Sequence, residues 1–152
     1  MKALSIRQPW AALVAAGAKR YETRSWPTAH RGPLAIHAST AFAARDRALC
    51  GGRLWADALG IPLGDSAALP LGRVLAVCEL VACVRTEDLG LLPEPERLFG
   101  DFRPGRWAWR LERVRRLATP VPVRGRLGLW ERPGAVDRPP AGLSARSEVP
   151  SG

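Results

Sequence analysis

Cysteine is scarce in this sequence. Its three cysteines, Cys50, Cys78 and Cys83, form no C-x-x-C pair. An odd number at such spacing excludes a disulfide framework and a zinc finger. Long apolar runs are also missing, since none approaches the roughly 18 residues that span a bilayer, and the N-terminus does not resemble a signal peptide. We therefore expect a cytoplasmic protein that makes no contact with a membrane.

Histidine and lysine are also rare. The sequence has only His30 and His37, with no metal-ligand spacing around them, so we expect neither a bound metal nor another cofactor. Of the 23 basic residues, only Lys2 and Lys19 are lysine. A lysine amine can lose its proton when it is removed from water, whereas arginine stays charged. Lys19, in the interior of the sequence, is therefore a candidate for a specific chemical role.

The length and the turn-forming residues point to one domain built from short strands. A chain of 152 residues can bury roughly two-thirds of its unfolded surface in a single core. Fifteen glycines and 14 prolines favour many turns. Residue patterns predict helices over 9–16 and 41–59, and strands over 2–6, 21–26, 33–38, 73–85, 107–114, 120–123 and 127–130. We expect an α+β fold, a small mixed or antiparallel β-barrel with two or more flanking helices.

The composition changes after residue 132. Residues 133–152 are rich in proline, glycine and serine and contain almost nothing to bury. We therefore predict a folded domain over residues 1–132 and a disordered C-terminal tail over 133–152.

The net charge of +9 is concentrated in two blocks, residues 1–40 and 101–132, which are separated by a slightly acidic middle. If the fold brings these blocks together, they form a basic face suited to phosphate backbones. The alternative is a compositional bias, because nearly all the basic residues are arginine and alanine and glycine are abundant.

Arg7, Gln8 and Trp10 stand where the first predicted strand passes into the first predicted helix. The start of a helix carries unpaired N–H groups and a partial positive charge, which with Arg7 and Gln8 would suit an anionic or amide-bearing group. Alternatively, Trp10 belongs to the core and Arg7 is a solvated cation. Ser5, just before them, has no neighbouring base in the sequence and so is not expected to be a nucleophile.

Lys19, Glu22 and Arg24 follow in close succession. On an extended strand Glu22 and Arg24 share one face, so their charges can pair. Lys19 is an odd number of residues from both, so on the same strand it would point to the opposite face. It joins them only if the turn after Gly17 directs it to their side. The alternative is that all three form a solvated face.

Glu79 interrupts the most apolar strand, where a carboxylate is costly unless it is paired or protonated. It faces either a pocket, opposite Lys19 or Arg24, or the solvent. Trp26 is one of several tryptophans that alternate with basic residues. Such rings stack on exposed bases, although tryptophans in strands are more often part of the core.

Several segments together resemble the ASCH domain family, in particular its stand-alone bacterial members. They are A-L-S-I-R-Q-P-W-A at residues 3–11 and the G-x-K-x-x-E-x-R pattern at 17–24. Segments at 31–39, 105–111 and 122–130 are similar as well, so the resemblance covers about residues 1–132.

This resemblance implies a PUA-like β-barrel with a cleft. Lys19, Glu22 and Arg24 would lie at that cleft, with Arg7 and Gln8 nearby. Members of the family are generally inferred to bind RNA or modified nucleosides. The expected partner is therefore RNA, tRNA included, or a modified nucleoside, and a scaffold that binds only a protein is a further alternative.

An enzyme acting on RNA or nucleosides is the other function that the resemblance implies. Some relatives hydrolyse N4-acetylcytidine with a lysine, a threonine and a glutamate, and others are reported to cleave RNA. Lys19 matches the lysine, Glu22 stands where the threonine is expected, and Glu79 is a physical candidate for the glutamate. The candidate catalytic residues are thus Lys19, Glu22 and Glu79. The candidate RNA- or nucleoside-binding residues are Arg7, Gln8, Trp10, Lys19, Glu22, Arg24 and Trp26.

Overall fold

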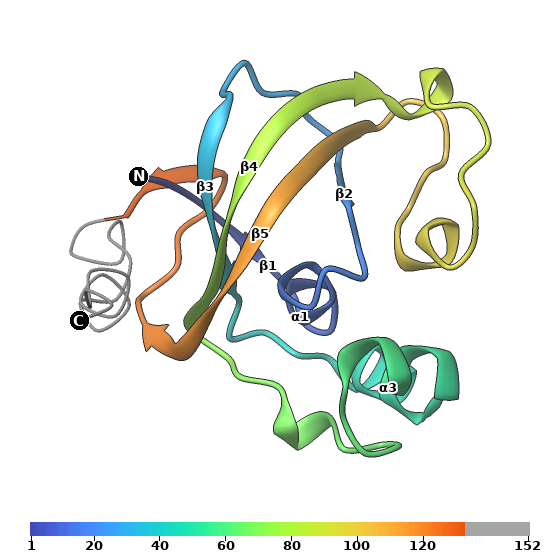
Figure 1. Cartoon of the computed structure of the whole chain (residues 1–152), viewed down its shortest axis with the longest axis vertical. Coiled ribbons are helices and arrows are strands. Elements are labelled where there is room, and N and C mark those ends of the chain that lie inside the picture. Colours follow the sequence, from blue (N-terminus) through green and yellow to red (C-terminus); the bar gives the residue numbers. More distant parts are fainter. Residues whose placement is uncertain (133–152) are drawn as a thin grey trace, which may run out of the picture.

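Six strands form one curled sheet in the order β2-β5-β4-β3-β1-β6 (Figure 1). The computed structural model describes residues 1–132. β1 and β3 are parallel, and the other neighbours are antiparallel. The strands are β1 (Lys2–Ile6), β2 (Tyr21–Arg24), β3 (Gly32–Ala38), β4 (Arg73–Arg85), β5 (Trp107–Pro122) and β6 (Leu129–Glu131).

Short helices flank this sheet and complete an α+β half-barrel. Helix α1 packs against β1, β3, β4 and β5. The predicted fold class is confirmed, although the barrel is only partly closed, since β2 and β6 are the two ends of the strand order. The helices are α1 (Trp10–Ala15), α2 (Ala44–Ala48), η1 (Leu49–Gly51), α3 (Arg53–Leu59), η2 (Ser66–Ala68), η3 (Thr86–Asp88) and η4 (Glu96–Phe99).

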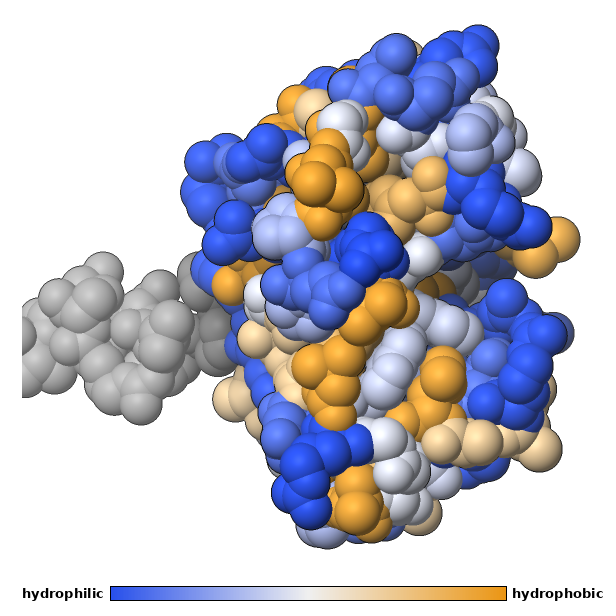
Figure 2. Space-filling view, turned by 90° about the vertical axis from the view of Figure 1, so that its right-hand side faces the viewer, coloured by the Kyte–Doolittle hydropathy of each residue, from blue (hydrophilic) through white to orange (hydrophobic). Residues whose placement is uncertain are grey.

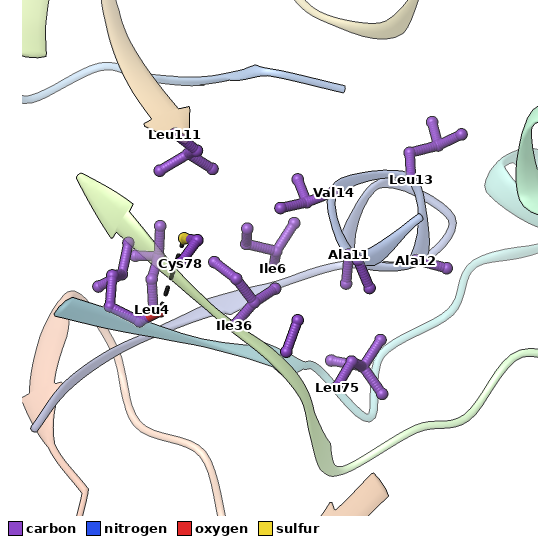
Figure 3. Close-up of a cluster of buried hydrophobic side chains, with 14 of the residues drawn as sticks. Leu4, Ile6, Ala11, Ala12, Leu13, Val14, Ile36, Leu75, Cys78 and Leu111 are labelled. Carbon is purple, nitrogen blue, oxygen red and sulfur yellow. Dashed lines mark hydrogen bonds between the residues drawn. The ribbon is translucent and has the colours of Figure 1, made fainter. Parts of the chain in front are cut away.

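The core lies between α1 and the curled sheet (Figure 3). Fully buried apolar side chains come from α1 and from β1, β3, β4 and β5, and include Leu4, Leu13, Ile36 and Leu111. Each such side chain contributes about 1.5–3 kcal/mol by leaving water. This packing fixes β1 and α1, the two elements from which the cleft described below is partly built.

Two predicted elements differ from the structure. The helix expected over residues 41–59 is divided into α2, η1 and α3, because Gly51 and Gly52 interrupt it and glycine disfavours a continuous helix. The strands expected over 107–114 and 120–123 are one strand, β5, which continues through Arg113 at φ 51° and through register shifts against β4. Only Trp107–Arg110 of β5 pairs with β2. Pro120 and Pro122, near the C-terminal end of β5, therefore lie along an edge that has no partner strand within residues 1–132, and such an edge tolerates proline.

The expected disordered tail, residues 133–152, lies outside the described residues. Within residues 1–132, no helix has the length and hydrophobicity that crossing a bilayer requires.

Candidate functional site

A cleft of about 690 Å³ opens between the start of α1, strand β2 and the segment 98–106. This volume falls in the range typical of small-molecule sites. Four cationic side chains and two carboxylates line the cleft, together with three tryptophans. Figure 2 views the molecule from the side on which α3 and the segment 86–106 lie, where apolar and hydrophilic residues alternate over a hollowed surface.

Lys19 enters the cleft through a turn after α1. Gly17 adopts φ 78°, a left-handed conformation that glycine accepts without strain. The N–H groups of Ala18 and Lys19 then both donate to the carbonyl of Leu13. The turn therefore directs the Lys19 side chain to the same site as Glu22, despite their opposite parity in the sequence.

The ammonium of Lys19 is almost fully buried, with 1% of the side chain exposed. Its Nζ lies 3.8 Å from Oε1 of Glu22, which is an ion pair but too long for a hydrogen bond. Within residues 1–132, Nζ has no hydrogen-bond partner. Burial lowers the pKa of Lys19 below its ordinary value, and the Glu22 carboxylate opposes this shift. The site thus contains a buried donor on a residue that lines the cleft, and this donor makes no hydrogen bond within residues 1–132.

The carboxylate of Glu22 is shared between two cations. Its Oε2 lies 3.2 Å from Nη2 of Arg24, and the same Nη2 donates to the main-chain carbonyl of Ser5 at 2.7 Å. Arg24 is thereby fixed between β2 and β1. The arrangement places two cationic donors and one acceptor in fixed positions on one wall of the cleft.

Aromatic rings form the rest of the cleft. Trp26 packs edge-on against the buried Trp109, whose Nε1 donates to the Trp26 carbonyl at 3.3 Å. Trp55 packs edge-on against both Trp10 and Phe99. Trp10, Trp26 and Trp55 all remain partly exposed. These contacts fix the rings while leaving part of each surface free for a ligand.

Six of the predicted site residues line this one cleft, and two do not. Gln8 is fully buried away from it, because its amide accepts from the N–H of Ala12 and donates to the carbonyl of Pro70. Gln8 therefore fixes the start of α1 and is not available to a ligand. Glu79 is also absent from the cleft lining, since it lies on β4 opposite Pro33 and Glu112. The residues that line the cleft are Arg7, Trp10, Lys19, Glu22, Arg24 and Trp26.

Sequence patterns missed several residues that the fold adds to the site. Arg106 donates to the carbonyl of Thr23 at 3.2 Å, and its Nε lies 3.5 Å from Asp101. Both side chains line the cleft, as does Trp55. Arg106 and Asp101 are more than 75 residues from β2, so no local pattern could have joined them to it.

A polar pair also forms where none was expected. Ser5 Oγ lies 2.9 Å from Nδ1 of His37, a base that is 32 residues away in the sequence. The parallel pairing of β1 with β3 puts Ser5 directly beside His37. The expectation that Ser5 has no neighbouring base is therefore wrong.

Fold and site together define a curled α+β domain with a polar, tryptophan-lined cleft. The profile of the ASCH domain matches residues 4–122, and the chain belongs to the ASCH domain family. Over 36 residues, this chain is 58% identical to activating signal cointegrator 1 of Homo sapiens and likewise to that of Mus musculus. Those residues are 24% of this chain and 6% of each of these longer proteins. A crystal structure of ASCH from Zymomonas mobilis superposes with a TM-score of 0.46 at 16% identity, covering 80% of this chain and 73% of that one.

Proposed function

We propose that this chain is a cytoplasmic module that binds RNA or a modified nucleoside, with a base held in the cleft. The observation that carries the proposal is the buried Lys19 ammonium, which lines the cleft and has no hydrogen-bond partner within residues 1–132. A buried donor without an acceptor costs free energy, and an acceptor atom of a ligand would remove that cost. Carbonyl oxygens and ring nitrogens of bases are such acceptors.

The rest of the cleft suits the same ligand. Arg24 and Lys19 present donors, and the Glu22 carboxylate presents acceptors, so a base edge with both kinds of group can be recognised. The fixed rings of Trp10 and Trp26 offer surfaces on which a base can stack. The surplus of cations over carboxylates favours a ligand that carries phosphate.

Calorimetric titration tests this proposal with nucleosides, N4-acetylcytidine among them, and with tRNA and single-stranded RNA. Wild type is expected to bind at least one of these, and Lys19→Met and Trp26→Ala should each weaken binding by roughly tenfold or more. Lys2→Met is the matched control, because Lys2 is the other lysine and its Nζ pairs with Glu131 at the surface. Absence of binding by wild type at low salt, or equal loss in the control, would contradict the proposal.

A hydrolase is the second candidate, and the lowered pKa of Lys19 favours it. Lowering the pKa of the Lys19 amine increases the share of the neutral form that can act as a general base. Neutral Lys19 could take a proton from the attacking water and return it to the leaving group, with Glu22 holding the ammonium that forms in between, and Arg24 could stabilise a developing negative charge. Incubation of wild type and Lys19→Ala with N4-acetylcytidine and with RNA decides the matter, since no turnover by wild type rejects this candidate.

A further inference from the structure

A second cavity, of about 720 Å³, adjoins the cleft at Ser5, which lines both. Its walls come from the end of β3, from Gly72 before β4 and from the segment that connects β5 to β6. Ser39 and Thr40 give it hydroxyl groups, and Arg124 and Arg126 give it positive charge. No acidic residue is among the described residues that line it.

A partly buried hydrogen-bond network connects the β5–β6 segment to the sheet. Nε2 of His37 lies 2.7 Å from the carbonyl of Val123, which can only accept, so Nε2 carries the proton. In the neutral ring Nδ1 is then an acceptor, and the Ser5 hydroxyl donates to it at 2.9 Å. Nε1 of Trp130 in turn donates to Ser5 Oγ at 3.2 Å. The network joins β1, β3 and β6 to the segment.

Gly125 lies directly on this network. A Cβ atom at position 125 would come within 2.5 Å of Cε1 of His37 and 2.8 Å of Oγ of Ser5. A larger residue would have to displace His37 or Ser5, so the backbone between Arg124 and Arg126 packs closely on this network. Arg124 and Arg126 therefore flank a glycine whose backbone lies against His37 and Ser5.

Both arginines are exposed, and neither forms an ion pair or hydrogen bond within residues 1–132. A guanidinium group binds phosphate oxygens through paired N–H donors, and its charge remains at every physiological pH. Leu127, next in the sequence, is 98% exposed and adds an apolar surface at the same site. The side chains of this cavity thus match a phosphate backbone with an adjacent base or sugar.

We propose that the second cavity binds the phosphate backbone of an RNA strand whose base occupies the cleft. This inference rests on the proposed function and narrows it, because it makes a single-stranded polynucleotide, rather than a free nucleoside, the ligand of the whole site. Arg124 and Arg126 contact consecutive phosphates, and Ser39 and Thr40 donate hydrogen bonds to phosphate or ribose oxygens. Ser5 lines both cavities, and the bound strand would extend past it from one cavity to the other.

The test compares a short single-stranded RNA of mixed sequence with the nucleoside or nucleotide that wild type binds best. The variant Arg124→Gln/Arg126→Gln should lose roughly tenfold in RNA affinity at low salt and should keep its affinity for the small ligand. The slope of log affinity against log salt concentration should fall by about 1.4, since each phosphate contact on a single strand contributes about 0.7. Arg115→Gln/Arg116→Gln is the matched control, because it removes the same charge at exposed positions of β5 outside both cavities.

The possible results separate this inference from the function on which it rests. An RNA affinity and salt slope unchanged in Arg124→Gln/Arg126→Gln overturn the inference alone. An equal loss in the control also overturns it, because the arginines would then act only through the overall charge. Wild type that binds a nucleoside but no RNA overturns it while the cleft proposal stands. Wild type that binds neither contradicts both.

Discussion

The ammonium of Lys19 and the carboxylate of Glu22 lie 3.8 Å apart, near enough for ionic attraction and too far for a hydrogen bond. The pair therefore offsets only part of the cost of burying Lys19. Arg24 competes for the same carboxylate at 3.2 Å. A ligand acceptor that reaches Nζ would supply the hydrogen bond that the protein leaves unmade.

The titration of Lys19 is the first prediction. Burial lowers its pKa, so Lys19 should lose its proton below the ordinary value of 10.5. Because Lys2 and Lys19 are the only lysines, protein labelled with ¹³C-lysine gives two signals to follow by NMR as the pH is raised. A Lys19 signal that titrates at or above 10.5 would contradict the buried geometry. The folded pKa is depressed, so this residue's contribution to stability should rise with pH between the folded pKa and 10.5.

Removing either member of the pair should have unequal effects on stability. Glu22→Gln leaves two cations beside each other without their shared carboxylate, and should lower the free energy of unfolding by about 3 kcal/mol. Lys19→Met leaves the carboxylate paired with Arg24 and should cost less than about 1 kcal/mol. Urea denaturation of both variants measures the difference. In Glu22→Gln the pKa of Lys19 should fall further, and the reverse order of stabilities would show that the pair is not the controlling interaction.

His37 should make the fold sensitive to mild acid. Burial lowers the pKa of its imidazole below the ordinary 6.5, so the unfolded chain binds a proton more readily than the folded one. The stability that His37 contributes is full above 6.5 and decreases as the pH falls from there to the folded pKa. Thermal unfolding between pH 7.5 and 5 should show a smaller dependence on pH in His37→Gln than in wild type. The same dependence in both would refute this, and His30→Gln controls for loss of a histidine elsewhere.

Gly125→Ala should destabilise the protein by about 1–3 kcal/mol, because its Cβ would overlap the His37 ring. Gly51→Ala is the control, since a Cβ there meets no atom within 4 Å. Urea denaturation should show little change in the control. Equal stabilities of wild type and Gly125→Ala would mean that the β5–β6 segment moves aside at no cost.

Local patterns predicted most of the elements, since strands such as β4 and the start of α1 follow from residue order alone. They failed where contacts between distant segments decide the outcome. Glu79 looked unpaired in the sequence, but the orientation of β4 in the sheet keeps it out of the cleft. Gln8 looked like a ligand residue, but the carbonyl of Pro70, 62 residues away, accepts its hydrogen bond.

The same difference between local and distant contacts explains why the cleft was only partly predictable. Lys19, Glu22 and Arg24 are close in the sequence, and a single turn was enough to bring them together. Asp101 and Arg106 reach the cleft from the segment before β5. The pairing of Ser5 with His37 depends on the register of two parallel strands, which no short pattern in either strand specifies.

Ser5 contributes to the two cavities through different chemical groups. Its carbonyl, which every amino acid possesses, holds Arg24 at the cleft, whereas its hydroxyl belongs to the network beneath Gly125. A substitution at position 5 can therefore alter the second cavity while the cleft keeps the hydrogen bond from Arg24 to the main-chain carbonyl. For protein engineering, Ser5→Ala would thus alter the second cavity and leave the contact between Arg24 and the carbonyl of residue 5 intact.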